Sequence, residues 1–295
     1  MGAFSYHYRR VMGKMFPNSY SLQQNIDDKK LCCYFVMFPS ELKYYSKING
    51  IPIFLDVWSE QAINTIIKKT ENLQLYYVTS LDVFKKIKEK KPNGGVYYMP
   101  LSVSDKYFSP NFEKYKDKKY DVIQLGRRNS VLHDFMLTYV SENPHIEYIY
   151  SEAGNNTGGL EYISTKRGGI GCLDTRGKFI RTLACSKVSL VSSPMIDNDK
   201  KTQFGVDFPT PRFYESAVLG CAMVGRYTLN EEMKKQNILK VCNNIQTYQQ
   251  FKETLDRALK VKRTELYETY KDFILNNLTS VRAKQIRCDL EQKNF

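Results

Sequence analysis

Residues 207 to 220 read DFPTPRFYESAVLG, and this stretch says more about the fold than any other part of the chain. Pro211 suits the first turn of a helix, where no backbone N–H is needed, and Thr210 before it can cap the free N–H groups. The helix would carry Arg212 in its first turn and Glu215 one turn later. Free N–H groups and the helix dipole at such an end suit a phosphate, while a carboxylate there suits sugar hydroxyls.

The stretch ends at Gly220, and an apolar strand is predicted directly after it, at 221–225. The predicted helix and strand thus carry a spaced motif: Asp207, then seven residues, then Glu215, and Gly220 five residues further on. This segment resembles the donor-site helix of GT-B glycosyltransferases, especially the family-4-like and CgeB-like groups. It departs from their pattern at two positions, because Asp207 stands in place of Glu and Ser216 in place of Ala.

The resemblance implies roles for the residues of this helix. In the family the first acid lies near the transferred sugar and the second binds the nucleotide ribose, which implies a catalytic place for Asp207 and a ribose contact for Glu215. The donor-binding residues expected on this segment are Thr210, Pro211, Arg212, Tyr214, Glu215 and Ser216. The alternative interpretation is a capped amphipathic helix whose acid is simply solvated.

Composition limits the function classes without choosing among them. The chain has 295 residues, of which 42% are hydrophobic, so it can bury one large core or two medium ones. It has 44 Lys and Arg against 31 Asp and Glu, a net charge of +13, which favours polyanions, nucleotide phosphates or an anionic membrane surface. The lysine clusters fall mostly between predicted elements, so solvated faces are the alternative.

Cysteine usage and hydropathy indicate the compartment. The seven cysteines are odd in number and have no C-x-x-C spacing, so neither a disulfide framework nor a zinc site is indicated. The longest apolar run, 31–38, is far shorter than the ~20 residues that cross a bilayer. We expect a cytoplasmic protein that contacts the inner face of an anionic membrane peripherally.

Short apolar runs alternate with amphipathic stretches from residue 31 onward, the pattern of parallel sheets flanked by helices. The first series predicts strands at 31–38, 51–57, 75–79 and 96–99 and helices near 39–48, 59–70 and 81–91. The second predicts strands at 121–125, 146–150, 188–192, 221–225 and 238–242 and helices near 130–143, 175–186, 229–236 and 247–259. The glycine-rich stretch 154–171 is predicted as a loop, either mobile over the donor or a surface excursion.

These series predict an α/β protein of the GT-B class, with two Rossmann-like domains that face each other across a cleft. The expected parts are an acceptor-side domain at 1–105, a linker at 106–120, a donor domain at 121–259 and a helical segment at 260–295 that crosses back to the first domain by resemblance. The N-terminal domain is expected to be abbreviated, because a typical one has more strands before the first strand predicted here. Residues 1–30 could form an extra helix, contact a membrane or complete a partner surface.

Candidate chemistry follows from strand ends. Gly126, Arg127 and Arg128 come where the first strand of the second series ends, so a glycine permits close backbone approach and an arginine can grip a diphosphate. An ordinary charged turn is the alternative. Asp56, at the end of the strand 51–55, is a candidate general base, or else the N-cap of the next helix in competition with Ser59.

No metal or cofactor is expected. Asp197, Asn198 and Asp199 match the Asp-x-Asp of GT-A enzymes, but flanking Pro194 and lysines favour a polar turn, and two Rossmann-like series argue against a single GT-A domain. The three histidines have no ligand spacing. The resemblance implies that Arg212, with Arg127 or Arg128, would stabilise the departing diphosphate without a metal ion.

The function implied by the resemblance is a glycosyltransferase that moves a sugar from a nucleotide-sugar donor to a glycan or lipid-linked acceptor. Two alternatives remain open at this stage. One is a non-catalytic basic module on the same scaffold that binds a membrane or polyanion, and the other is a nucleotide-sugar epimerase. Nucleic acid is not expected as a partner, because no recognised motif interleaves aromatic residues with the basic ones.

Overall fold

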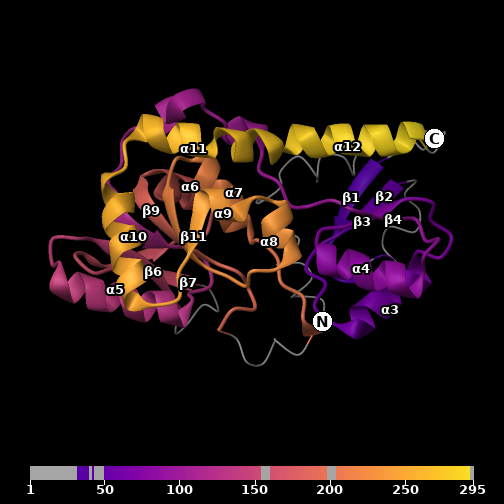
Figure 1. The fold of residues 1–295 in the computed structure, drawn as a ribbon, viewed down its shortest axis with the longest axis horizontal. Helices are drawn as coiled ribbons and strands as arrows, with labels where there is room; N and C mark the ends of the chain where they lie inside the picture. The colour runs from indigo at the N-terminus through magenta and orange to yellow at the C-terminus, as the bar shows by residue number, and fades with distance from the viewer. Residues whose placement is uncertain (1–31, 40–41, 43–49, 154–159, 198–203, 293–295) are drawn as a thin grey trace. The chain divides into compact units, whose positions relative to one another are not determined.

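The computed structural model describes residues 32–39, 42, 50–153, 160–197 and 204–292 and divides the chain into two compact units (Figure 1). Unit 1 comprises Met1–Pro100 and Phe204–Val206, and unit 2 comprises Leu101–Gln203 and Asp207–Phe295. The helix expected near 39–48 and the segment 1–30 lie essentially outside the described residues. Each unit has its own sheet, parallel in unit 1 and mostly parallel in unit 2, with helices between the strands, so the α/β class is confirmed.

Unit 1 has four parallel strands that follow one another across the sheet in chain order. They are β1 (Cys32–Val36), β2 (Gly50–Phe54), β3 (Tyr76–Val78) and β4 (Val96–Tyr98). The helix α3 (Glu60–Lys69) joins β2 to β3, and α4 (Leu81–Lys90) joins β3 to β4. Right-handed crossovers that step in one direction place their helices on one face, and α3 and α4 do contact each other.

The helices of unit 1 begin and pack as their sequences predict. Ser59 accepts the Ala62 N–H at 3.1 Å and Ser80 accepts the Val83 N–H at 3.5 Å, so a serine caps each helix. Both helices turn an apolar stripe inward, with buried side chains at Ile63, Ile66, Val83 and Ile87.

Unit 2 has a seven-stranded sheet in the order β11-β10-β9-β5-β6-β7-β8. Its strands are β5 (Tyr120–Gln124), β6 (Tyr148–Ala153), β7 (Leu160–Ser164), β8 (Gly168–Cys172), β9 (Ser186–Ser192), β10 (Ala222–Arg226) and β11 (Cys242–Asn244). All neighbours pair in parallel except β6 with β7 and β7 with β8, which pair antiparallel.

Two 3₁₀ segments precede this sheet in the chain, and α-helices follow and connect its strands. Two 3₁₀ segments come first, η3 (Asp105–Tyr107) and η4 (Pro110–Tyr115). The α-helices are α5 (Ser130–Glu142), α6 (Arg176–Ala184), α7 (Pro211–Val218), α8 (Glu231–Lys235), α9 (Ile238–Val241), α10 (Tyr248–Lys260), α11 (Arg263–Asn276) and α12 (Thr279–Gln292). In Figure 1, α10 lies beside α5, and the contacts of α10 also reach β9 and β10.

The order of the strands creates a topological switch point in unit 2. From β5 the chain moves outward through β6, β7 and β8, and then returns through α6 to β9 on the other side of β5. The pairs Val122–Val188 and Ile123–Ser189 join β5 to β9 in parallel register. In open α/β sheets, ligands bind outside the carboxyl ends of the strands at such a point. The ends of β5 and β9 are therefore where a site is expected in this unit.

Two predictions about local structure were wrong. Residues 160–171 of the stretch expected as a loop belong to the hairpin β7–β8, in which Tyr162 and Ser164 are buried while β8 is mostly exposed. The expected strand at 238–242 is helical as far as Val241, because Asn237 adopts a left-handed φ of 56° and starts a short turn. Its apolar residues Ile238 and Val241 are three apart and both buried, a spacing that fits a helix face.

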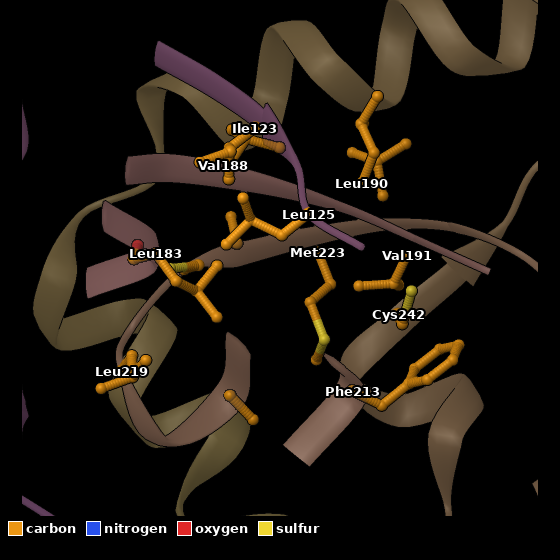
Figure 2. Close-up of a cluster of buried hydrophobic side chains, with 14 of the residues drawn as sticks. Ile123, Leu125, Leu183, Val188, Leu190, Val191, Phe213, Leu219, Met223 and Cys242 are labelled. Atoms are coloured by element: carbon orange, nitrogen blue, oxygen red, sulfur yellow. The ribbon is translucent and has the colours of Figure 1, made fainter. Parts of the chain in front are cut away.

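The core of unit 2 lies between the sheet and its helices (Figure 2). Figure 2 shows Val191 of β9, Met223 of β10 and Cys242 of β11 beside Phe213 of α7. All four side chains are almost completely buried. Helix α7 is thus fixed to the sheet by its apolar side, which leaves its first turn to be positioned at the switch point.

The segment 106–120, expected as a linker, contributes to this packing. Phe112 is buried in the core, and a Cβ on Gly220 would lie 2.7 Å from its ring, at a residue whose φ is +64°. Only glycine therefore fits at the end of α7. The Lys118 ammonium donates to the carbonyls of Ala184 and Leu219 at 2.9 and 3.0 Å, and so ties the ends of α6 and α7 together.

Among the described residues, none of the helices combines the length and the apolar character that crossing a bilayer requires.

Candidate functional site

Helix α7 begins at Pro211, as predicted, but Thr210 does not cap it with its side chain. The Thr210 hydroxyl instead donates to the Ser192 carbonyl at 3.3 Å, at the end of β9. The prediction that this side chain caps the free N–H groups was therefore wrong, because the hydroxyl is directed toward the end of β9. The bond attaches the start of α7 to the switch point.

Gly126 brings the end of β5 to the same place. Its φ is +81°, and a Cβ built on it would lie 3.7 Å from the Arg212 Nε. Its N–H donates to the Tyr162 hydroxyl at 3.3 Å, and its carbonyl accepts from the Ser151 hydroxyl at 2.5 Å. The turn after β5 and the first turn of α7, two separate motifs in the sequence, are thus brought together.

Arg212 extends from α7 into this corner. Its guanidinium carbon lies 4.1 Å from the centroid of the Phe179 ring and one of its nitrogens pairs with Glu215. Burial, followed by the nearby charge of Arg176, lowers the pKa of Arg212 to about 9. The side chain therefore remains a cation at neutral pH.

Glu215 is held between two arginines. Its Oε1 lies 2.5 Å from the Arg176 Nη2, and its Oε2 pairs with the Arg212 Nη1. Its side chain is only 5% exposed, whereas the two arginine side chains are 19% and 20% exposed. The cluster of these three side chains carries one net positive charge. Its arginine side chains are more exposed to solvent than its carboxylate.

Arg176 is the first residue of α6, whose N-cap is Thr175 with a hydroxyl that accepts the Lys178 N–H at 3.2 Å. The guanidinium carbon of Arg176 lies 5.7 Å from the Tyr107 ring centroid and 5.8 Å from that of Phe179. Cations and aromatic rings therefore alternate from Tyr107 to Arg212. This arrangement can bind a phosphate or carboxylate, because guanidinium groups offer forked donors to such oxygens.

Asp207 lies in a different environment. Its carboxylate accepts the Ser193 hydroxyl at 2.6 Å and the backbone N–H groups of Met195 and Phe208 at 3.3 and 3.1 Å. It is 4% exposed, and burial raises its pKa although these hydrogen bonds oppose the shift. In this structure it fastens the loop before α7 to the end of β9.

Tyr214 and Ser216 are directed into the protein interior. The Tyr214 hydroxyl donates to the Gln236 side chain, and its ring stacks on Phe273 with centroids 5.8 Å apart. The Ser216 hydroxyl donates to the Ser189 hydroxyl of β9 at 2.9 Å. Both side chains anchor α7 to its neighbours and lie away from the cluster of Arg212, Glu215 and Arg176.

The loop after β5 presents Arg127 and Arg128 to solvent. Arg128 lies 3.7 Å from the Glu152 carboxylate, and its guanidinium carbon is 5.7 Å from the Tyr150 ring centroid. Asn129 ends the loop and caps α5 by accepting the Leu132 N–H at 2.9 Å. Gly126 therefore lies beside the Arg212 side chain, while the two arginines that follow it lie on the exposed side of the turn.

Asp56 belongs to unit 1. It is exposed after the end of β2, and its φ of +48° lies in the left-handed region, which aspartate tolerates better than most residues. Because Ser59 caps α3, Asp56 does not have the capping role considered as its alternative.

The Asp-x-Asp stretch is described only at its first residue. Asp197 accepts two bonds from the Arg226 guanidinium at 2.6 and 2.7 Å and one from Asn129 at 2.9 Å. Burial would raise its pKa, but these hydrogen bonds and the Arg226 charge lower it overall. No group of three or more His, Cys, Asp or Glu side chains in the described ranges is placed to hold a metal ion.

Sequence reasoning missed Arg176, Phe179 and Tyr162. All three come from the chain between β6 and β9, which passes from one side of β5 to the other. Thr175 marks the start of a helix in the sequence, but no spacing relates it to residues 207–220. The sheet order decides that α6 and α7 lie together.

No protein-family model matches the chain, and no curated protein matches it. Its structure is similar to a crystal structure of accessory secretory protein 1, 2 and 3 in Streptococcus pneumoniae, with a TM-score of 0.56 and 12% identity over 94% of this chain and 56% of that one. It is also similar to the crystal structure of the GtfA/B complex, with a TM-score of 0.51 and 12% identity over 86% of this chain and 55% of that one. The chain thus spans little more than half of either protein. Together with its two α/β units, these likenesses show that the chain has the GT-B fold.

Proposed function

We propose that this protein is a glycosyltransferase that binds the diphosphate part of a nucleotide-sugar donor at the switch point of unit 2. One observation carries the proposal: the Arg212 guanidinium lies beside Gly126 at the ends of β5 and β9, in a cluster with a net positive charge. A glycine without a side chain allows close approach, and a partly exposed guanidinium can take a phosphate.

The chemistry proposed for this site is stabilisation of the leaving group. When the bond between sugar and phosphate breaks, negative charge builds on the departing diphosphate, and a preorganised cation lowers the energy of that state. Arg212 supplies the cation, and no metal ion is required in this scheme. If the reaction inverts the configuration at the anomeric carbon of the sugar, Asp56 of unit 1 remains our candidate for the general base that takes the proton from the acceptor hydroxyl.

The acceptor side is proposed only as a class. We propose a glycan or lipid-linked acceptor and a cytoplasmic protein, in keeping with the net charge of +13, which favours peripheral contact with an anionic membrane. Binding to vesicles that contain anionic lipid, weakened by added salt, would support the membrane contact.

The donor site can be tested by calorimetric titration with UDP, CDP, ADP and GDP. We expect at least one to bind, and Arg212→Met to weaken that affinity about tenfold or more, since it removes a charge-assisted hydrogen bond. Arg181→Met is the matched control, because Arg181 is an exposed arginine on α6 outside the cluster. Equal losses in both variants, or no binding by the parent protein, would contradict the proposal.

A second function is a non-catalytic binding module on the same fold. The observation that favours it is the state of the two motif acids, because Asp207 and Glu215 are both buried and already engaged by protein donors. This alternative predicts nucleotide binding without sugar transfer or donor hydrolysis. Release of free nucleotide from UDP-, GDP- and ADP-sugars, followed with and without EDTA, separates a metal-independent enzyme from such a module.

A further inference from the structure

Glu215 stands where the resemblance implies a ribose contact, yet both of its oxygens are occupied. Arg176 holds Oε1 at 2.5 Å and Arg212 holds Oε2, and the carboxylate is 5% exposed. A ribose hydroxyl can donate to a carboxylate only if it can reach the oxygen within hydrogen-bond distance. In this arrangement two guanidinium groups occupy the positions next to the Glu215 oxygens that a ribose hydroxyl would need.

Arg176 is fixed where it stands. It projects from the first turn of a helix whose N-cap is satisfied, and it lies near the rings of Tyr107 and Phe179. Tyr107 is itself held, since its carbonyl accepts the Tyr115 hydroxyl at 2.8 Å. A ligand that displaced Arg176 would have to break a buried ion pair and these ring contacts together, and a buried charge that loses its partner is costly.

We infer that Arg176 is a specificity-determining residue that excludes the nucleotide ribose from Glu215, so that the site recognises the diphosphate and not the sugar hydroxyls. This inference rests on the proposed nucleotide site. Glu215 then acts as a positioning residue, because it holds the guanidinium of Arg212 toward Gly126 without touching the ligand. The 2′ and 3′ hydroxyls contribute little to affinity.

The test compares the ribonucleoside diphosphates UDP, CDP, ADP and GDP with their 2′,3′-dideoxy counterparts by calorimetric titration. In the parent protein the best-bound nucleotide and its dideoxy form should differ by less than about threefold. Arg176→Met keeps an unbranched apolar stem and frees one oxygen of Glu215. It should therefore prefer the ribonucleotide about tenfold or more, the effect of a hydrogen bond to a charged group. Arg181→Met, on the same helix, should leave the ratio unchanged.

The outcomes separate the inference from the function on which it rests. If no nucleoside diphosphate binds the parent protein, the proposed function fails and the inference fails with it. If one binds but its dideoxy form binds ten times more weakly, only the inference fails, because the ribose then reaches an acceptor.

A folded Arg176→Met protein that gains no ribose preference, or loses all binding, would overturn the role given to Arg176. Circular dichroism establishes that the variant is folded. Should it not fold, Arg176→Ala replaces it in the test, because alanine also leaves Glu215 Oε1 without its guanidinium partner and favours a helix, and the same gain in ribose preference is expected.

Discussion

Asp207 and Glu215 stand at the two ends of one short motif, and their surroundings are opposite. The loop around Asp207 offers a serine hydroxyl and backbone N–H groups, all of them neutral donors. The first turns of α7 and α6 surround Glu215 with two guanidinium groups. Both acids are buried to a similar degree, with 4% of each residue exposed.

The difference teaches that burial alone does not set the role of an acid. A buried carboxylate with neutral donors still bears the cost of desolvation, and burial raises the pKa of Asp207 accordingly. A carboxylate between two cations instead compensates their charges. Its removal would leave two partly buried guanidinium groups near each other without a counter-charge.

The largest effect is therefore expected from Glu215→Gln. We expect it to lower the free energy of unfolding by about 3–5 kcal/mol, because it breaks a buried ion pair on one side only. Urea denaturation followed by circular dichroism measures this. Glu113→Gln is the control, since its ion pair with Arg263 is 59% exposed on the glutamate side and should matter by less than about 1 kcal/mol. Similar losses of unfolding free energy in the two variants would show that Glu215 is not the counter-charge of a buried cluster.

A smaller effect is expected from Asp197→Asn, which removes the charge that binds Arg226. We expect a loss of about 1.5–3 kcal/mol at neutral pH. Because the folded protein lowers the pKa of Asp197 below its usual 3.8, this stabilisation is present above that value and disappears as the pH falls through the folded-state pKa. The gap between variant and parent should accordingly shrink in acid, and a gap that grows there would refute the assignment.

The smallest effect is expected from Asp207→Asn, and its dependence on pH has the opposite sign. An asparagine oxygen can accept the Met195 and Phe208 N–H groups, and its amide N–H can donate to the Ser193 hydroxyl oxygen, so the change at neutral pH should be about 1 kcal/mol or less. Because the folded protein raises the pKa of Asp207 above 3.8, its contribution is fully present below that value and is lost as the pH rises through the folded-state pKa. Stability measured from about pH 4 to pH 7 should favour the variant increasingly, and a flat difference would contradict the raised pKa.

The periodic parts of the fold could be predicted from local sequence. Pro211 marks the start of α7 and Gly220 follows its end, and Ser59 and Ser80 mark the starts of α3 and α4. Such residues can be recognised in the sequence because capping and turn formation involve only a few neighbouring residues. The run 238–242 was misassigned because four or five apolar residues satisfy a strand and a buried turn of helix equally well. The hairpin β7–β8 was missed because glycines in a strand carry no side-chain pattern.

By itself the sequence determined the α/β class, most of the elements and the two motifs at Gly126 and at Pro211 to Gly220, since each depends on spacing along the chain. Only the tertiary structure decided that Arg176 would share Glu215 with Arg212 and that Asp207 would be held by neutral donors. The physical reason is that the chain passes from β8, at one edge of the sheet, to β9, which lies on the opposite side of β5. That crossing brings α6 to α7, and the charges that surround a carboxylate depend on which segments meet in space.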